Sequence, residues 1–309
     1  MVSRLIIEPA LPICDAHHHL GARSYFLPDY LADLGSGHRI ERTVAIECGA
    51  YYGPNGYVDE TRALLAMADG GGKDRSVAAG IVARVNLCAD DVEAAIMAHV
   101  EAAGGRLAGV RHIAAFDPDP AIPTNYAPAP PDLYRSDAFR RGFAKLAEAG
   151  LCFDSWQYHP QLPDLLSLAR TFPNTTVVID HVGGPLGIGP YAGRREDVFP
   201  VWRRAMAALA ELPNTVVKLG GLGMPICGFA FEPSPSPAAL AHAWRPYLES
   251  CIDLFGVQRA MFESNFPVDR HCCDYRTLWN AFKLITSGTS GEEKQGLFSA
   301  TAQRVYGLW

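Results

Sequence analysis

The sequence has no long hydrophobic run, no cysteine pair of the CxxC type and no excess of basic residues. No segment approaches the roughly 18 consecutive apolar residues that a membrane span requires. Without CxxC pairs, the eight cysteines form neither a zinc knuckle nor a dithiol redox motif. The net charge of −6 argues against a surface for nucleic acid or anionic membranes. We therefore expect neither nucleic acid nor a membrane among the partners.

Two further absences concern targeting and cofactors. Residues 1–8 lack the long apolar segment of a signal peptide, and the scattered cysteines suit a reducing compartment. These features predict a cytoplasmic protein with free thiols. No glycine-rich dinucleotide-binding turn follows the first candidate strand, so we expect no organic cofactor.

Short β-rich runs alternate with amphipathic helical segments along the whole chain. The strand candidates are residues 11–17, 42–48, 77–85, 108–114, 151–156, 175–181, 215–219 and 259–264. The helix candidates are residues 59–68, 91–103, 137–149, 163–170, 194–212, 237–255 and 275–285, with a closing helix at 292–306. Eight β-then-α units joined by right-handed crossovers can close into a barrel of parallel strands.

This alternation predicts the α/β class, with a single (β/α)8 TIM barrel that spans residues 1–309 and carries an additional C-terminal helix. Hydrophobic residues make up 49% of the chain, which is enough for the core of such a barrel. No break in composition and no internal repeat divides the sequence. An open doubly wound sheet is the alternative architecture.

The most informative motif is Asp15-Ala16-His17-His18-His19, at the end of the first strand candidate. Alternate residues of a strand share a face, so His17 and His19 point one way and His18 the other. Two imidazoles side by side form half of a metal site. A polar strand end with solvated histidines is the alternative, and the rest of the chain has to decide between the two.

Polar residues also stand at or near the ends of the other strand candidates. In a barrel these ends gather on the face where active sites are built. They are Glu47, Arg84, Arg111, Asp154, Tyr158, Asp180, His181, Lys218, Glu263, Asn265 and Asp269. Because an isolated buried charge costs many kcal/mol, these groups must pair with one another or bind a ligand or metal. A structural ion pair between neighbouring strands is the alternative to a catalytic role for Lys218 and Glu263.

Two proline-rich segments, residues 116–131 and 221–237, follow the fourth and seventh strand candidates. Loops that follow the strands of a barrel surround its active site. We therefore predict that these two segments form walls or lids of the site; stiffened surface loops without contact to a ligand are the alternative.

Six motifs point to a known family. In chain order they are Asp-Ala-His-His-His-Leu at 15–20, Gly-Val-Arg-His at 109–112, Val-Ile-Asp-His-Val-Gly-Gly-Pro at 178–185, Val-Lys-Leu-Gly-Gly-Leu at 217–222, Phe-Glu-Ser-Asn-Phe-Pro at 262–267 and Thr-Ala-Gln-Arg-Val-Tyr-Gly-Leu at 301–308. With these motifs the chain resembles the amidohydrolase superfamily, in particular the amidohydrolase 2 branch that contains 2-pyrone-4,6-dicarboxylate lactonase, 4-sulfomuconolactonase and L-fuconolactonase. The motifs extend over almost the whole chain.

The resemblance implies a barrel in which two first-strand histidines, a sixth-strand histidine and an eighth-strand aspartate surround the reaction centre, with a divalent metal in some members. His17, His19 and His181 match this pattern and are the predicted ligands of zinc or manganese. Asn265 stands where the family has the aspartate of a Ser-Asp-Trp-Pro run. Because an amide cannot take a proton from water, Glu263 on the same strand face is the predicted base or fourth ligand, with Asp269 and Glu47 as weaker substitutes.

We thus expect a hydrolase that opens the lactone of a small carboxylated or sugar-derived molecule with activated water. The candidate catalytic residues are Glu263, His181 and Asn265. The candidate substrate-binding residues are Arg84, Arg111, Lys218 and Tyr158. A metal-dependent decarboxylase of the same superfamily, an amide-bond hydrolase and a non-catalytic binding barrel are the alternatives. An exposed helical face would also suit a homodimer.

Overall fold

The computed structural model describes residues 5–68, 76–123 and 128–308. Its eight strands are parallel, and each pairs with the next one along the chain. They are β1 (Pro12–His18), β2 (Arg39–Ile46), β3 (Ser76–Arg84), β4 (Leu107–Arg111), β5 (Cys152–Ser155), β6 (Val177–Ile179), β7 (Thr215–Leu219) and β8 (Ala260–Phe262). Every predicted strand segment overlaps one of them, and the predicted TIM barrel is confirmed.

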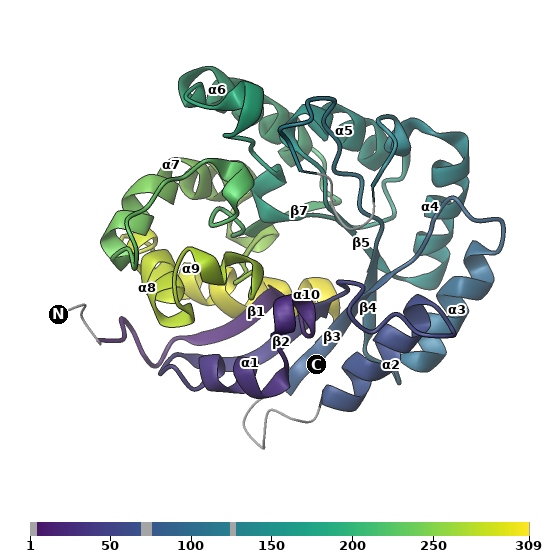
Figure 1. Cartoon of the computed structure of the whole chain (residues 1–309), viewed down its shortest axis with the longest axis horizontal. Helices are drawn as coiled ribbons and strands as arrows, with labels where there is room; N and C mark the ends of the chain where they lie inside the picture. The colour runs from purple at the N-terminus through teal and green to yellow at the C-terminus, as the bar shows by residue number, and fades with distance from the viewer. Residues whose placement is uncertain (1–4, 69–75, 124–127, 309) are drawn as a thin grey trace.

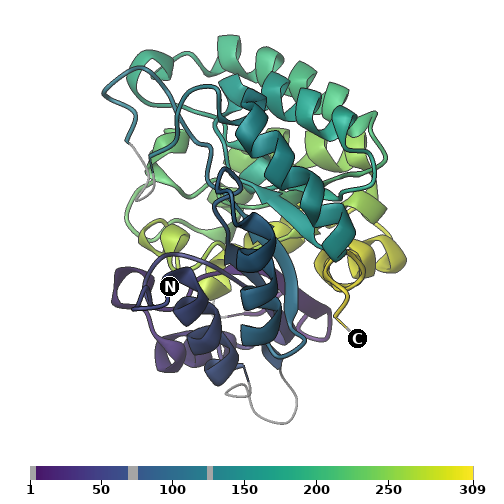
Figure 2. The same ribbon diagram turned by 90° about the vertical axis from the view of Figure 1, so that its right-hand side faces the viewer.

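Helices connect the strands and form an outer layer. They are α1 (Leu27–Leu34), α2 (Tyr57–Met67), α3 (Val92–Ala102), α4 (Asp137–Ala149), α5 (Leu162–Thr171), α6 (Arg195–Ala210), α7 (Pro237–Phe255) and α8 (Tyr275–Ile285). Figure 1 shows them following one another around the sheet in chain order, and Figure 2 shows the outer layer from the side of α3 and α4. Among the described residues, no helix is long and apolar enough to cross a membrane.

The structure adds one helix and divides another. Helix α1 has no counterpart among the predicted segments, although Leu27, Tyr30, Leu31 and Leu34 have the i, i+3, i+4, i+7 spacing of an amphipathic helix; it is only eight residues long. The predicted closing helix consists of α9 (Gly291–Gln295), a π-helical turn (Gly296–Ala300) and α10 (Thr301–Tyr306). The predicted C-terminal helix is therefore present but irregular.

The buried carboxylate of Asp15 joins the first and last strands of the barrel. It accepts hydrogen bonds from the backbone N–H of Ser264 at 2.8 Å, the Ser264 hydroxyl at 2.7 Å, the Tyr275 hydroxyl at 2.9 Å and the Tyr30 hydroxyl at 3.0 Å. Next to it, His18 bridges to Phe266 in the parallel sense. These bonds close the barrel between β1 and β8 and fix the end of β1, which carries the histidine motif.

Candidate active site

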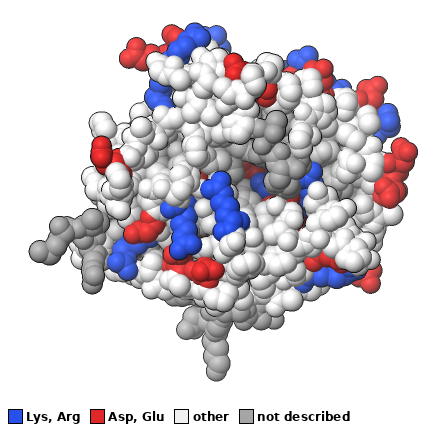
Figure 3. All heavy atoms as spheres, viewed as in Figure 1, with Lys and Arg blue, Asp and Glu red and all other residues white. Residues whose placement is uncertain are grey.

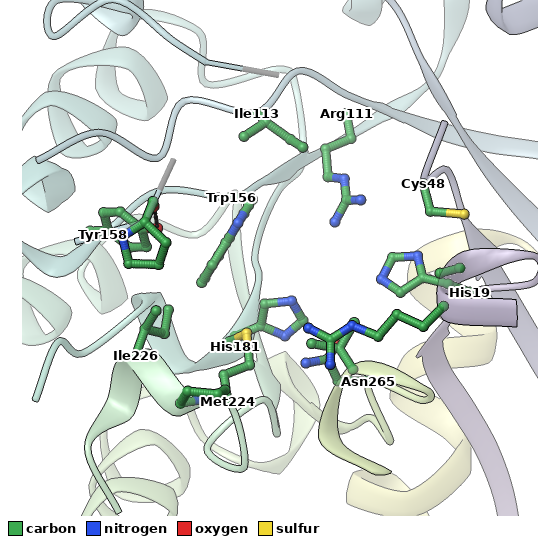
Figure 4. A pocket seen from close by; sticks show the side chains of 15 residues that line it. His19, Cys48, Arg111, Ile113, Trp156, Tyr158, His181, Met224, Ile226 and Asn265 are labelled. Carbon is green, nitrogen blue, oxygen red and sulfur yellow. Dashed lines mark hydrogen bonds between the residues drawn. The ribbon is translucent and has the colours of Figure 1, made fainter. Parts of the chain in front are cut away.

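A cavity of about 450 Å³ opens at the carboxyl ends of the strands. Its walls are formed by His19, Ala22, Arg23, Cys48, Arg111, Ile113, Pro123, Trp156, Tyr158, His181, Met224, Pro225, Ile226, Asn265 and Val268. Figure 4 shows the labelled members of this set facing a common space. Both predicted wall segments contribute, through Pro123 and through the run from Met224 to Ile226, and that prediction is confirmed.

A layer of buried charges lies beneath this cavity. We use the term buried charged layer for Glu47, Arg111, Asp154, Asp180, Lys218 and Glu263, none of which is more than 3% exposed. At its centre the Lys218 ammonium lies 2.5 Å from Asp154 Oδ2 and 3.0 Å from Asp180 Oδ1. Although burial opposes it, Lys218 holds the pKa of Asp180 well below its usual range.

Beside Lys218, a carboxylate supports the sixth-strand histidine. Glu263 Oε1 lies 2.6 Å from His181 Nδ1 and accepts a second hydrogen bond from the His181 backbone N–H at 3.1 Å. Burial alone would raise the pKa of Glu263, but the imidazoles of His181 and His17 hold it at about 2. Because the Glu263 carboxylate only accepts, His181 Nδ1 carries the proton of this hydrogen bond, and a ring with a single proton keeps its lone pair on Nε2.

Two glycines after β7 make room for this pair. A Cβ on Gly221 would lie 2.5 Å from His181 Cβ, and a Cβ on Gly220 would lie 2.4 Å from Glu263 Cγ. The backbone around His181 is also unusual, since His181 and Val182 have φ values of 53° and 47°. Positive φ is rare for a β-branched residue, and such strain gathers at functional sites. The position of the His181 ring is therefore maintained at the cost of a strained backbone.

The two histidines of β1 form the other half of the site. His19 Nδ1 lies 2.9 Å from the carbonyl oxygen of Ile46, which only accepts, so His19 Nε2 carries a lone pair. This atom lies 3.1 Å from His17 Nε2. Burial lowers the pKa of both rings, and Lys218 lowers that of His17 further. His18 points away, with its Nε2 2.9 Å from the Thr43 hydroxyl, as the strand alternation predicts.

The donor set fits a divalent metal ion. Among the described residues, His17, His181 and Glu263 bring possible ligand atoms within 4.8 Å of one another, and His17 does so again with Asp154 and Asp180; His19 belongs to neither group. In the buried charged layer, four carboxylates face two cations, an excess of two negative charges. An ion of charge +2 beside the layer would balance this excess, and imidazole nitrogens suit such an ion.

Asn265 lines the cavity where the family pattern has an acid, and a second carboxyl group lies behind it. The Asn265 carboxamide donates a hydrogen bond of 2.9 Å to Asp269 Oδ1, and the Gly223 N–H donates one of 3.0 Å to Asp269 Oδ2. Burial raises the pKa of Asp269 to about 7. Sequence reasoning named Asp269 only as a weaker substitute for the missing aspartate.

The structure brings two of the four candidate substrate-binding residues to the cavity and places the other two elsewhere. Arg111 and Tyr158 line the cavity, whereas Arg84 and Lys218 do not. The Arg84 guanidinium lies 4.6 Å from the centre of the Tyr57 ring, and Lys218 is enclosed in the buried charged layer. Direct binding of substrate by these two residues has no support in this geometry.

One cationic residue of the wall was missed. Arg23 lines the cavity and makes no hydrogen bond or ion pair with any residue that the structure describes. Its nearness to the histidine motif in the sequence was the available signal. On the face in Figure 3, Lys and Arg side chains gather beside the central hollow.

Fold and site together define a class: a (β/α)8-barrel enzyme with histidines and carboxylates at the carboxyl ends of its strands. Residues 14–308 match the family model described as Amidohydrolase, and the chain belongs to this family. It is a hydrolase of the amidohydrolase superfamily.

Similar proteins span nearly the whole chain. The uncharacterized protein y4mH of Sinorhizobium fredii is 34% identical over 92% of this chain and 86% of its own length. The L-fucono-1,5-lactonase of Burkholderia multivorans is 28% identical over 93% of this chain and 87% of its own length. A crystal structure of an amidohydrolase from Burkholderia multivorans with bound zinc has a TM-score of 0.76 and 25% identity, covering 96% of this chain and 99% of that one.

Proposed function

We propose that this enzyme is a lactonase, which opens the cyclic ester of a small carboxylated or sugar-derived molecule with water. The observation that carries the proposal is the His181–Glu263 pair at the cavity, with 2.6 Å between Nδ1 and Oε1. An imidazole whose Nδ1–H is held by a carboxylate in this way serves as a general base through Nε2. The similarity to an L-fucono-1,5-lactonase over 93% of the chain supports an ester rather than an amide substrate.

In this proposal His181 moves the proton and Glu263 orients His181. Glu263 is fully buried and its pKa is about 2, so it is both out of reach of water and a weak base. His181 Nε2 takes a proton from water as the water oxygen attacks the lactone carbonyl carbon. When the bond from this carbon to the ring oxygen breaks, His181 returns the proton to that oxygen. The product is a hydroxy acid.

Arg111 would stabilise the negative charge that develops on the carbonyl oxygen. Its Nε lies 2.6 Å from Glu47 Oε1 and its Nη2 lies 2.7 Å from the Glu47 carbonyl oxygen, so the guanidinium is fixed before substrate arrives. A divalent ion, when bound, supplies Lewis-acid activation at the same centre. His17 and His19, whose Nε2 atoms lie 3.1 Å apart, would hold it. The predicted third ligand, His181, and Glu263 of the donor group that includes His17 would instead serve as the base and its support.

The walls favour a ligand with one charged end. No Asp or Glu is among the described residues that line the cavity, while Arg23 and Arg111 are. Trp156, Ile113 and Met224 supply apolar surface for a ring. Arg23 would therefore bind a carboxylate of the substrate, because an arginine pairs with carboxylates through two parallel hydrogen bonds.

A panel of five- and six-membered lactones, with and without a carboxylate, tests the proposal. We expect acid release, followed with a pH indicator, from at least one of them. Glu263→Gln and His181→Gln should each lower kcat by about 100-fold or more, because proton transfer through His181 is lost. The surface variant Glu249→Gln is the matched control and should keep full activity, since Glu249 only pairs with Arg245 on α7.

Other outcomes would contradict the proposal. Carbon dioxide release from aromatic or enoic acids, without opening of any lactone, would indicate the decarboxylase of the same superfamily instead. Full activity of His181→Gln would show that His181 is not the base. The proposed lactonase mechanism, which depends on this base, would then be wrong.

A further inference from the structure

Asn265 replaces the acid of the family pattern, and the residue that determines what it offers to a ligand is Asp269. We infer that Asp269 is a positioning residue: its carboxylate holds the Asn265 carboxamide so that Oδ1 faces the cavity as a fixed hydrogen-bond acceptor. This inference rests on the proposed hydrolysis for its chemical meaning, but its geometry stands independently. It explains how the enzyme keeps an acceptor at this position without a carboxylate.

The hydrogen bonds around the pair leave the carboxamide one orientation. Asn265 Nδ2 donates to Asp269 Oδ1 at 2.9 Å, and above its pKa of about 7 the Asp269 carboxylate only accepts, so the amide nitrogen lies on this side. The other carboxylate oxygen is occupied by the Gly223 N–H at 3.0 Å. Asn265 Oδ1 bonds to no residue that the structure describes, and Asn265 lines the cavity. The oxygen is therefore available to a ligand.

The backbone holds both residues in place. The Asn265 N–H donates to the His17 carbonyl oxygen at 2.9 Å, and the Asp269 N–H donates to the Asn265 carbonyl oxygen at 3.1 Å. Asn265 has a φ of 54°, a left-handed conformation that asparagine tolerates better than most residues. A Cβ on Gly223 would lie 2.8 Å from Asp269 Cγ, so the loop after β7 packs directly on the carboxylate.

In the proposed reaction, the attacking water donates two hydrogen bonds, one from each of its hydrogens. His181 Nε2 accepts one of them and takes it as a proton. Asn265 Oδ1 accepts the other, which orients the water oxygen toward the carbonyl carbon. A neutral acceptor orients this water without competing for its proton, so the division of roles between His181 and Asn265 depends on the orientation that Asp269 imposes.

Asp269→Asn tests the inference because it should invert the Asn265 carboxamide. The Gly223 N–H still needs an acceptor, so the new amide would turn its oxygen there and its NH2 toward Asn265. Asn265 would then turn its own oxygen inward and present NH2 to the cavity. At about pH 8, above the pKa of Asp269 at about 7, we expect kcat to fall about tenfold or more with an almost unchanged melting temperature.

The double variant Asn265→Asp with Asp269→Asn separates positioning from a structural role. An aspartate at 265 accepts from the new NH2 and still presents an oxygen to the cavity. We expect this double variant to recover most of the kcat that Asp269→Asn loses. Unchanged kcat in Asp269→Asn, or a double variant no faster than that single variant, would overturn the inference.

A measurement without substrate keeps this test independent of the lactonase proposal. In protein labelled with ¹⁵N at asparagine side chains, the Asn265 NH2 signal is assigned by its loss in Asn265→Asp. Its hydrogens should exchange slowly with water in the wild type and much faster in Asp269→Asn. Equal exchange in both proteins would refute the positioning role. If the exchange rates are as predicted but the enzyme opens no lactone, only the lactonase proposal is refuted.

Discussion

Lys218 holds the buried charged layer together at the level of single residues. Its ammonium contacts Asp154 Oδ2 at 2.5 Å, Asp180 Oδ1 at 3.0 Å and His17 Nδ1 at 3.0 Å. The Tyr306 hydroxyl of α10 adds a hydrogen bond of 2.8 Å to Asp154. A buried ion pair of this kind adds little net stability by itself, but removal of one partner leaves the others uncompensated.

We predict that Lys218→Met destabilises the protein by about 3–5 kcal/mol, because two buried carboxylates lose their cation. Urea denaturation followed by circular dichroism measures this change. Lys145→Met is the control, since Lys145 pairs with Glu93 at the surface and its loss should leave the denaturation midpoint almost unchanged. Wild-type stability of Lys218→Met would mean that the carboxylates take up protons without cost.

At the scale of elements, the segments that follow β6 and β7 decide where His181 lies. Four consecutive residues after β6, from His181 to Gly184, have positive φ. The Trp202 indole on α6 donates a hydrogen bond of 2.7 Å to the Val182 carbonyl oxygen and anchors this turn. Gly221, after β7, approaches His181 so closely that a side chain there would displace the ring.

We predict that Gly221→Ala lowers kcat by about 100-fold or more, because its new Cβ would push His181 away from Glu263. Gly193→Ala is a matched control. Both glycines have a φ of 70°, but a Cβ on Gly193 meets nothing within 4 Å. Both variants should lose about 1–2 kcal/mol from the left-handed backbone, whereas only Gly221→Ala should lose activity. Equal activity of the two variants in the lactone assay would contradict this account.

At the scale of the whole molecule, neutral histidines that are buried or half-buried outside the cavity make the stability of the barrel depend on pH. Burial lowers the pKa of His38, His99, His112 and His159 to about 4. In the unfolded chain a histidine has a pKa of about 6.5. Between these two values the unfolded chain binds more protons than the folded one, so stability falls as the pH falls.

We predict that the free energy of unfolding decreases between about pH 6.5 and pH 4, by up to about 1.4 kcal/mol per pH unit for each such histidine. Acids with raised pKa values act in the opposite direction, and they are Asp15, Asp33, Glu60, Asp154 and Asp269. The histidines outnumber them, because burial lowers the pKa of His17, His18 and His19 as well. Urea denaturation at several pH values measures the slope, and His99→Gln should reduce it. A slope that His99→Gln leaves unchanged would show that His99 is not neutral in the fold.

Much of the architecture was accessible from the sequence. Alternating apolar runs predicted the eight strands, and the spacing of the histidine motif predicted that His18 points away from His17 and His19. Both predictions succeeded because both features depend on local periodicity. The positions after strand candidates also placed His181, Asn265 and the two loop walls correctly at one end of the barrel. Local patterns suffice here, since parallel strands in a barrel necessarily end on one face.

Only the tertiary structure decided the roles of individual charges. Glu263 lies below the imidazoles and not at the cavity, Arg84 turns to Tyr57, and Arg23 enters the wall. Asp269 reaches Asn265 within a local turn, but its second carboxylate oxygen is held by the Gly223 N–H of the loop after β7, a contact that only the tertiary structure brings about. The sequence determined the barrel and the end at which its chemistry lies. Which groups pair depends on distances between residues far apart in the chain, and these are fixed only when the barrel closes.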